Sequence, residues 1–572
     1  MILEIMYFVY AIAMAFIYFV PGFLVSLFFK KLNLIEKITI SFFFSTLLLI
    51  IILIAYHYAG FASSPLILIP YLIVTLVLFF FARKQFFNLK FDREAKLLLI
   101  LFFIIFIAKV ATQIFIKYYP AGTDYVGHYK TVLFFLGEDW KLPESFINME
   151  GIYLPYRTPG FYMLLSFFLY IFGNSFWVCQ LAATLVNTVF ILPAYCIARH
   201  VFNKKIALLT ILFVSMIPFV ETSLYMHAKM LVAYFSFLLF YIFITKKVSP
   251  YLIGAVAGMG LMIHQSSFIF ILAIAVPYFF EFIKKRSMSE FKNIIKIAIA
   301  FLLVVAPWFI ITYLRYGSVL SSSYNYFPIY TTNYGTGKDT PEEIWANFKK
   351  TSPLYIVGAR VVNTITFATP IILVFKIIGL FFPLTLITGK TNPPLPVNFA
   401  SNTDLPWAYY YYHSLSGILT MLMFVFAAIG FLKLWRYNKR LFYFVFIPVV
   451  FTIIWYGWVI LAVLRSGVPE IVPILVMVGF WEIFKRKNYN KILKLVFALA
   501  IIELIVFAIF YSWHIDVAEQ IAKDRECNPK YPESDVTIKK LEQLQSAYKL
   551  FGIQGIVGGY DKLYNNNYTC PQ

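Results

Sequence analysis

Charge is scarce in this chain. Of its 572 residues only 13% are charged, whereas 61% are hydrophobic and 20% are aromatic. A soluble globular protein normally carries roughly 25% charged residues, so this chain has too little polar surface to cover a water-soluble globule of its size. Its many separate apolar runs, roughly 17–25 residues each, match the length that a transmembrane helix needs. We therefore predict an all-α polytopic integral membrane protein.

Several motifs of soluble and nucleotide-driven enzymes are also missing. The sequence has no glycine-rich phosphate loop, no cysteine and histidine set with zinc spacing, and no serine-nucleophile elbow. Without a Walker A sequence, a nucleotide-driven pump is disfavoured. No cofactor is indicated with certainty, and a requirement for a divalent metal stays open. The start, MILEIMYFVY, lacks the basic region of a cleavable signal peptide, and we interpret it as the first span.

The charge that is present is mostly positive, with a formal net charge of +21. Lysine and arginine cluster in short loops between the apolar runs: Lys30/Lys31, Arg83–Lys96, Arg199–Lys205, Lys246/Lys247, Lys284–Arg286, Lys433–Arg440 and Lys485–Lys494. This distribution is typical of cytoplasmic loops under the positive-inside rule and not of a surface that binds nucleic acid. We therefore expect no nucleic-acid partner.

With these loops as cytoplasmic markers, the chain is predicted to cross the membrane about fourteen times, with both termini outside. The predicted spans are 7–28, 38–57, 66–82, 96–116, 176–198, 206–221, 230–245, 250–263, 266–283, 294–313, 412–434, 440–462, 468–484 and 491–511. The apolar segment 354–387 is interpreted as a re-entrant or surface-lying hairpin, because one more span there would move Lys433–Arg440 to the wrong side.

This topology leaves three sizeable segments outside: 117–175, 316–411 and the polar tail 512–572. Cys527 and Cys570 lie in the tail, and an outside location would allow a disulfide between them. The other two cysteines, Cys179 and Cys196, lie in an apolar run and are expected to be packing residues.

The first outside segment begins with YYPAGTDYVGHYK, residues 118–130. Pro120 and Gly122 end the preceding span, and Thr123 can cap a helix that starts at Asp124. His128 follows four residues later, on the same helical face as Asp124. Ionisable residues at membrane depth are functional candidates, so both are candidate catalytic residues. The alternative is that they only cap and solubilise an interfacial helix.

A second apolar stretch, YLPYRTPGFYMLLSFFLYIFGNS, is too short for a full span. Pro155 and Pro159 interrupt it and Gly173 ends it. A true span here would move the basic loop Arg199–Lys205 outside. We therefore expect a helix that lies along the membrane surface.

Five further residues are candidates for substrate binding. Glu221 and His227 follow a proline at a predicted span end, and His264 lies at a short break between two spans; structural hydrogen bonding is the alternative for each. Lys229 and Arg465 lie on the outer side, against the positive-inside bias. The positive charge of both residues favours binding of a phosphate group, and Arg465 also offers a planar set of hydrogen-bond donors. Lys229 has the alternative of an ordinary snorkelling lysine.

The layout resembles that of membrane glycosyltransferases of the GT-C class. The features are a span leading to an outside acid, then YRTPGFYMLLSFFLYIFGNS, a span ending YCIARHVFNKKIALLTILFVSMIP, and the late VLRSGVPEIVPILVMVGFW. The resemblance implies a catalytic core at 96–315, preceded by extra helices at 1–95 and followed by spans at 412–511. It also implies that Asp124 lies at the catalytic centre and that Arg465 binds the lipid phosphate. Glu221, His227 and Lys229 match a second acidic or polar position.

The implied activity is an inverting transfer of a sugar from a polyprenyl or dolichyl phosphate to a glycan, lipid or protein acceptor. The enzyme would lie in the plasma membrane with its active site outside. Two alternatives remain from the sequence alone: a transporter or flippase of lipid-linked glycans, and a polymerase or ligase of surface polysaccharide. A flippase would show two matching halves and charges deep within its spans, and neither is evident.

Overall fold

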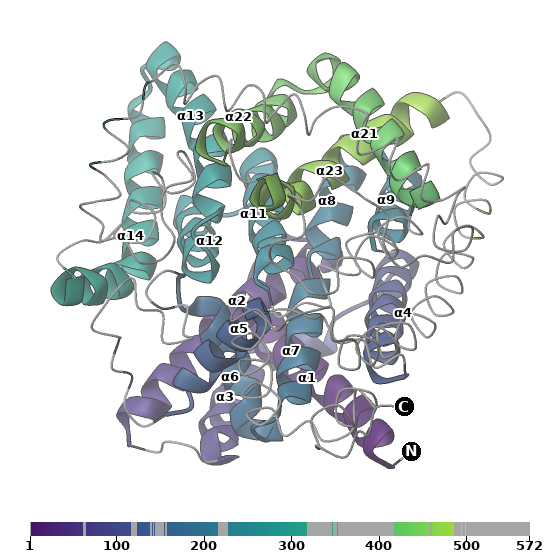
Figure 1. Ribbon diagram of the computed structural model, residues 1–572. Helices are drawn as coiled ribbons and strands as arrows, with labels where there is room; N and C mark the ends of the chain where they lie inside the picture. The colour runs from purple at the N-terminus through teal and green to yellow at the C-terminus, as the bar shows by residue number, and fades with distance from the viewer. Residues whose placement is uncertain are drawn as a thin grey trace, which may run out of the picture.

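The computed structural model describes residues 2–60, 65–115, 123–137, 157–215, 227–316, 417–456 and 460–485, with a few single positions besides. Every regular element among them is helical (Figure 1). The predicted site residue Glu221, the cysteines Cys527 and Cys570, the segment 354–387 and the tail 512–572 lie outside the described residues.

The first half of the chain forms α1 (Ile2–Ser26), α2 (Leu34–Tyr58), the short 3-10 helix η1 (Pro65–Ile67), α3 (Leu68–Phe87), α4 (Arg93–Phe115), α5 (Thr123–Phe134), α6 (Gly160–Phe172), α7 (Phe176–Thr188), α8 (Ile191–Val201) and α9 (Lys204–Ser215). The second half forms α11 (Lys229–Thr245), α12 (Pro250–Ile263), α13 (Ser267–Lys285), α14 (Met288–Tyr316), α21 (Gly417–Tyr437), α22 (Lys439–Tyr456) and α23 (Ile460–Phe484).

Six stretches of the described chain are helical, long and apolar enough to cross a membrane: Ile5–Ser26, Leu34–Tyr58, Pro65–Phe87, Phe176–Val201, Ser267–Lys284 and Met288–Arg315. Shorter apolar helices accompany them. These helices confirm the predicted polytopic membrane fold, and the count of fourteen spans stays a prediction. The predicted span 176–198 is divided into two helices. Helix α7 ends at Thr188 and α8 begins at Ile191, with Val189 and Phe190 between them.

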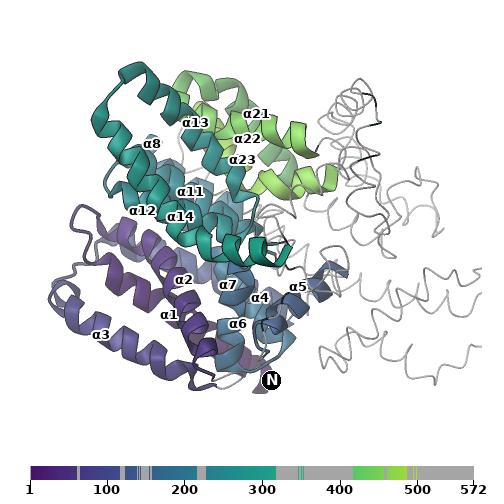
Figure 2. The same cartoon turned by 90° about the vertical axis from the view of Figure 1, so that its left-hand side faces the viewer.

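Helix α11 lies at the centre of the bundle. It packs against α7, α8, α12, α13 and α23, and its residues from Lys229 to Phe243 are all buried. Helices α1–α3 lie below this centre and α21–α23 above it in both views (Figures 1 and 2). Because α11 is enclosed by helices from both parts, residues at its ends are well placed to be fixed by several elements at once.

Small residues let α12 and α14 approach closely, and the two helices lie side by side in both views (Figures 1 and 2). A Cβ added at Gly254 would lie 2.1 Å from the carbonyl oxygen of Ile297, and one added at Gly258 would lie 2.9 Å from Cβ of Val304. The spacing of these two glycines is the GxxxG pattern of membrane helix pairs. Only glycine permits this packing distance.

Several acids of the bundle pair with bases from the predicted cytoplasmic loops. Glu36 is 3% exposed; its carboxylate accepts hydrogen bonds from Tyr241 at 2.5 Å and from Lys247 at 2.6 Å. Glu94 is 2.6 Å from Nε of Arg199. A buried carboxylate needs such partners because burial removes its hydration. These pairs connect helices that are distant in the sequence.

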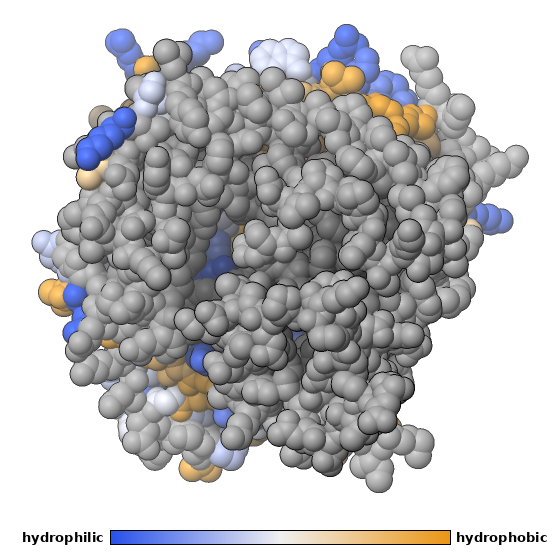
Figure 3. All heavy atoms as spheres, in the orientation of Figure 1, coloured by the Kyte–Doolittle hydropathy of each residue, from blue (hydrophilic) through white to orange (hydrophobic). Residues whose placement is uncertain are grey.

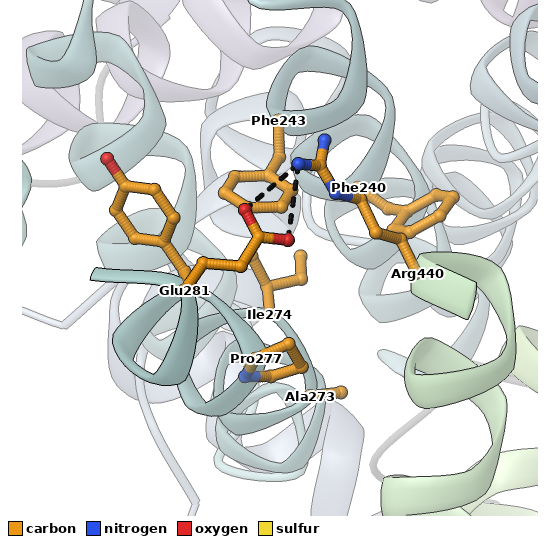
Figure 4. A pocket seen from close by; sticks show the side chains of 8 residues that line it. Phe240, Phe243, Ala273, Ile274, Pro277, Glu281 and Arg440 are labelled. Carbon is orange, nitrogen blue, oxygen red and sulfur yellow. Dashed lines mark hydrogen bonds and ion pairs between the residues drawn. The ribbon is translucent and has the colours of Figure 1, made fainter. Parts of the chain in front are cut away.

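A small pocket lies beside another of these pairs, between α11, α13 and α22. Figure 4 shows Glu281 of α13 and Arg440 of α22 pointing toward each other across it, and their ion pair spans 3.1 Å. The remaining lining residues are Phe240, Phe243, Ala273, Ile274, Pro277 and Tyr278. This lining is apolar apart from the ion pair, so the pocket is part of the packing between helices.

The structure corrects the prediction for α6. The sequence predicts a helix that lies along the membrane surface. Instead, side chains from Gly160 to Tyr170 are all buried, because α2, α5, α7, α12 and η1 pack around the helix. Its 13 residues rise only about 20 Å, which is short of a full span. It ends at Gly173, as predicted, where φ is +97°.

Candidate functional site

Helix α5, which carries His128, is fixed to α6 by hydrogen bonds from side chains. Ser166 of α6 donates its hydroxyl to the carbonyl oxygen of Val132 at 2.7 Å, and Tyr170 donates to that of Phe135 at 3.2 Å. Tyr129 donates to Oδ1 of Asn174 at 3.0 Å. The predicted helix at this position is confirmed, and its first residue is Thr123. The hydrogen bonds to α6 therefore help to set the orientation of α5.

His128 is 2% exposed and bonds through both ring nitrogens. Its Nδ1 lies 2.9 Å from the hydroxyl of Tyr162 on α6, and its Nε2 lies 3.0 Å from Nη1 of Arg157. A guanidinium group has only donors, so Nε2 must accept this hydrogen bond. The ring is therefore neutral in this arrangement, with its proton on Nδ1.

Arg157 joins His128 to His227. Its Nη1 lies 3.4 Å from Nε2 of His227, and the centres of the two imidazole rings are 5.1 Å apart. The ring of His264 lies 5.9 Å from that of His227. Three histidines and one arginine, drawn from α5, the segment before α6, the segment before α11 and the end of α12, thus meet at one place.

Asn187 of α7 fixes the segment that carries His227 and Lys229. Its Nδ2 donates to the carbonyl oxygen of His227 at 3.0 Å, and its Oδ1 accepts from the backbone N–H of Leu231 at 3.2 Å. Leu231 is the third residue of α11, so Asn187 supplies an N-terminal cap from a different helix. Lys229, at the first position of α11, is only 7% exposed.

The end of α12 is held against the start of α6 by a close backbone approach. A Cβ added at Gly160 would lie 2.7 Å from the carbonyl oxygen of Met262. Two residues after Met262, Nδ1 of His264 accepts from the backbone N–H of Ser266 at 3.1 Å and lies 2.8 Å from its hydroxyl. This contact brings His264 toward Arg157.

The electrostatics of the cluster disfavour protonated histidines. Burial lowers the pKa of His128 well below its usual 6.5, and the charges of Arg157 and Lys229 and the ring of His264 lower it further. Burial is also the largest cause that lowers the pKa of His227, and the charges of Lys229 and Arg157 lower it further. For His264 the causes are burial, then Arg157 and Lys229. The three rings are therefore neutral at pH 7 beside two cationic side chains.

The cluster lies at the end of the bundle opposite the acid–base pairs. Lys229 begins α11, whereas Lys247, which pairs with Glu36, follows its last residue. The 17 residues between these ends rise about 25 Å, which is close to the thickness of the hydrocarbon core.

Figure 3 views the face drawn in Figure 1, where described hydrophilic residues are visible along the upper edge and in a small central area.

Four of the predicted site residues are brought together: His128, His227, His264 and Lys229. Asp124 lies on α5, one helical turn before His128. The contacts of its side chain lie outside the part of the chain that the structure describes, as does Glu221.

Arg465 lies within α23, which begins at Ile460. The predicted spans 440–462 and 468–484 would put it in the connection between them. The helices are instead α22, ending at Tyr456, and α23, so Arg465 lies on the second turn of a helix. The contacts of its side chain are not among those that the structure describes.

Sequence reasoning missed Arg157, Tyr162 and Asn187. Arg157 carried a usable signal, because it is a cation on the predicted outer side, against the positive-inside bias that singled out Lys229. Asn187 also carried one, as an amide within a predicted span, where polar groups need partners. Tyr162 looks like any aromatic residue of an apolar run, and only the structure shows its contact with His128.

Among the described residues, no group of three histidine, cysteine, aspartate or glutamate side chains could hold a metal ion. The Nε2 atoms of His128 and His227 both face Nη1 of Arg157, which occupies the lone pairs that a metal would need. These two rings do not fit a metal through those atoms.

Residues 156–311 match the model of the family described as dolichyl-phosphate-mannose-protein mannosyltransferase. This stretch, called the mannosyltransferase-family segment below, is similar to that family. The match confirms the predicted resemblance to GT-C glycosyltransferases. The mannosyltransferase-family segment includes Arg157, His227, Lys229 and His264, so most of the cluster lies within it. No curated protein matches the chain in a sequence search.

Solved structures of two kinds are similar to this chain. One is the archaeal oligosaccharyltransferase AglB from Archaeoglobus fulgidus in complex with an inhibitory peptide and a dolichol-phosphate, at 14% identity and a TM-score of 0.40, covering 83% of this chain and 60% of that one. The other is ArnT from Cupriavidus metallidurans bound to undecaprenyl phosphate, at 12% identity and a TM-score of 0.36, covering 83% and 92%. The chain thus spans 60% of the length of the oligosaccharyltransferase.

Proposed function

We propose that the protein is a membrane glycosyltransferase that moves a sugar from a polyprenyl or dolichyl phosphate donor to a glycan, lipid or protein acceptor at the outer face of the plasma membrane. The observation that carries this proposal is the contact between Arg157, from the mannosyltransferase-family segment, and His128, on the helix that carries Asp124. It joins the cations of the cluster to the helix that bears the candidate base.

The chemistry needs a base, cations and an apolar groove. In the proposed step, the acceptor hydroxyl attacks the anomeric carbon of the sugar while the bond from that carbon to the phosphate oxygen breaks. The hydroxyl proton passes to the carboxylate of Asp124, and the polyprenyl phosphate leaves with the electron pair. The displacement inverts the anomeric configuration.

The leaving phosphate gains negative charge as this bond breaks, so cations at its position stabilise the transition state. Lys229 and Arg465 were the cations proposed from the sequence, and Arg157 is now a third. Arg157 and Lys229 both act electrostatically on His128, which supports a shared location for their charges. A planar guanidinium also offers paired donors to phosphate oxygens.

The test is sugar transfer and release of polyprenyl phosphate by purified protein given a polyprenyl phosphoryl mannose. Asp124→Asn should lower the turnover number by roughly 10²–10⁴-fold, the usual loss for a general base. Asp92→Asn is the matched control, because Asp92 accepts a hydrogen bond from the backbone N–H of Ala95 near the other end of the bundle. It should leave turnover close to that of the wild type.

Two outcomes would contradict the proposal. If Asp124→Asn protein is folded and transfers sugar at the wild-type rate, Asp124 is not the base. If the wild-type protein moves a lipid-linked glycan across a vesicle membrane without breaking the bond between sugar and phosphate, the protein is a flippase and not a transferase.

A further inference from the structure

We infer that His128 and His227 are positioning residues that hold Arg157 through two unprotonated ring nitrogens, so that its guanidinium meets the phosphate of the lipid donor only while both rings are neutral. This inference rests on the proposed function for its substrate. Its geometric part, the state of the two rings, stands on the contacts alone.

The hydrogen-bonding capacity of the three groups decides the first step. Nη1 of Arg157 can only donate, so Nε2 of His128, at 3.0 Å, accepts. The proton of the neutral ring is then on Nδ1, which donates to the hydroxyl oxygen of Tyr162 at 2.9 Å. Arg157 therefore fixes the tautomer of His128, and the hydroxyl oxygen of Tyr162 accepts the Nδ1 proton of that tautomer.

The second ring gives Arg157 a second acceptor. Nε2 of His227 lies 3.4 Å from the same Nη1, and Asn187 holds the backbone of His227 in place through its carbonyl oxygen. One guanidinium nitrogen is thus placed between ring nitrogens from α5 and from the segment before α11. Two fixed acceptors restrict a long, flexible side chain far more than one does.

A proton on either ring would break this arrangement. An imidazolium has two donors and no acceptor, so it would turn a donor and a positive charge toward Arg157. The charged groups that face His128 are Arg157, before α6, and Lys229, on α11; the ring of His264 faces it from the end of α12. The same three groups face His227, and the rings of His128 and His227 face each other at 5.1 Å. Along α5 itself, Asp124 precedes His128 by one turn and Lys130 follows it by two residues.

The cluster therefore couples donor binding to proton concentration. At pH 7 both rings are neutral and Arg157 is held in place. As the pH falls into the range where the rings gain protons, Arg157 is repelled and the donor phosphate loses a cation. A side chain that accepts at the same position but cannot gain a proton should keep Arg157 in place and remove the loss in acid.

The first experiment measures equilibrium binding of a polyprenyl phosphoryl mannose, a phosphodiester whose charge is constant between pH 4.5 and 7.5. Glutamine places an amide oxygen near the position of Nε2 and does not titrate. We expect His128→Gln to bind like the wild type at pH 7.5, and His128→Ala and His128→Lys to bind at least tenfold more weakly. Wild-type affinity should fall at least tenfold from pH 7.5 to pH 4.5, and that of the double variant His128→Gln/His227→Gln by less than threefold.

His200→Gln is the matched control, since His200 lies in the last turn of α8, among the predicted cytoplasmic basic residues. It should keep both the affinity and the pH dependence of the wild type. If His128→Gln binds as weakly as His128→Ala, or if the double variant loses affinity in acid as the wild type does, the histidines do not act on Arg157 in this way.

The second experiment does not depend on the function. Nitrogen-15 NMR of histidine-labelled protein, with peaks assigned through the two glutamine variants, should show both rings neutral at pH 7 and the proton of His128 on Nδ1. An imidazolium signal at pH 7, or a proton on Nε2 of His128, would overturn the positioning role. If the wild-type protein binds no donor, the proposed function fails, and the NMR result still decides the state of the two rings.

Discussion

Asn187 illustrates how much one buried amide can hold in place. It is fully buried in α7 and bonds to the carbonyl oxygen of His227, just before α11, and to the backbone N–H of Leu231 in the first turn of α11. Both of these hydrogen bonds are to the backbone, so replacing Asn187 leaves a backbone donor and a backbone acceptor without this partner. An unsatisfied buried group of this kind costs about 1–3 kcal/mol.

Asn187→Leu should lower the free energy of unfolding by about 1–3 kcal/mol and raise the KM for the lipid donor more than it lowers kcat. The reason is that Lys229 and His227 lose their fixed position, whereas Asp124, the proposed base on α5, keeps its own. Denaturation in detergent and steady-state kinetics measure the two effects.

Asn203→Leu is the comparison for this prediction, because Asn203 bonds the backbone N–H of Ile206 at the start of α9. It removes a cap far from the cluster, so it should reduce stability without changing KM. Equal KM values for the two variants would show that Asn187 has only a structural role.

The neutral histidines should also make stability depend on pH. Burial lowers the pKa values of His128, His227 and His264 in the folded protein below the usual 6.5 of the unfolded chain. As the pH falls below about 6.5, the unfolded chain binds protons that the folded chain does not, so the folded state loses stability. The stabilising contribution is therefore fully present above this pH.

Each such proton adds a slope of about 1.4 kcal/mol per pH unit. Wild-type protein should therefore unfold more easily at pH 5.5 than at pH 7.5, and His128→Gln/His227→Gln should show a smaller difference. The check is urea denaturation in mild detergent at both pH values. A wild-type stability that rises toward pH 5.5 would contradict the neutral assignment.

At the scale of elements, the pairing of α12 with α14 depends on the absence of side chains. Gly254→Ala would place a methyl group 2.1 Å from a backbone carbonyl oxygen, so one helix must move. We expect a loss of about 1–3 kcal/mol, the usual range for overpacking, despite the better helix propensity of alanine. Thermal unfolding in detergent measures it.

The same helix offers the control. A Cβ at Gly260 would lie 3.2 Å from Cβ of Phe235, so a shift of only a few tenths of an ångström accommodates it. Gly260→Ala gains the same helix propensity and should be close to neutral. If both variants have wild-type stability, the close approach of α12 to α14 is not needed for the fold.

The sequence predicted most helices to within a few residues, because long apolar runs and basic loops are strong signals. The prediction for α6 was wrong, although the sequence of this helix already argued against a position along the membrane surface. A helix along a membrane surface needs a polar face, and GFYMLLSFFLYIF offers only Ser166 as a small polar residue. A helix that is apolar on all sides is covered by protein or lipid all around, as α6 is by its neighbours.

The site was predicted in part for a different reason. In a sequence with few charges, cations and histidines at the outer ends of spans are easy to identify. This signal identified His128, His227, Lys229 and His264 as candidates. Which of them meet is a question of tertiary packing, since His128 and His264 are separated by more than a hundred residues. No periodicity carries that information, and Arg157, which joins His128 to His227, lies in what looks like a loop in the sequence.

At the scale of the whole molecule, the predicted orientation in the membrane can be tested directly. The positive-inside rule places residue 150 outside and residue 203 inside, with the cluster on the outer side. Single cysteines introduced at these positions should be labelled from opposite sides of intact cells by a membrane-impermeant maleimide. Labelling of both from the same side would refute the topology.

The tie between Glu36, Tyr241 and Lys247 has a consequence for how the chain is made. Tyr241 leaves the ribosome 205 residues after Glu36, which at 5–20 residues per second is a delay of roughly 10–40 s. During that time Glu36 has only the local partner Asn33, to which it is joined by a capping box. We expect α2 to enter the membrane before Glu36, near its N-terminal end, can bond to Tyr241 and Lys247. These two bonds fix α2 only after α11 has been inserted. Nascent chains stopped before residue 241 should therefore be extracted from the membrane more easily than chains stopped after residue 260.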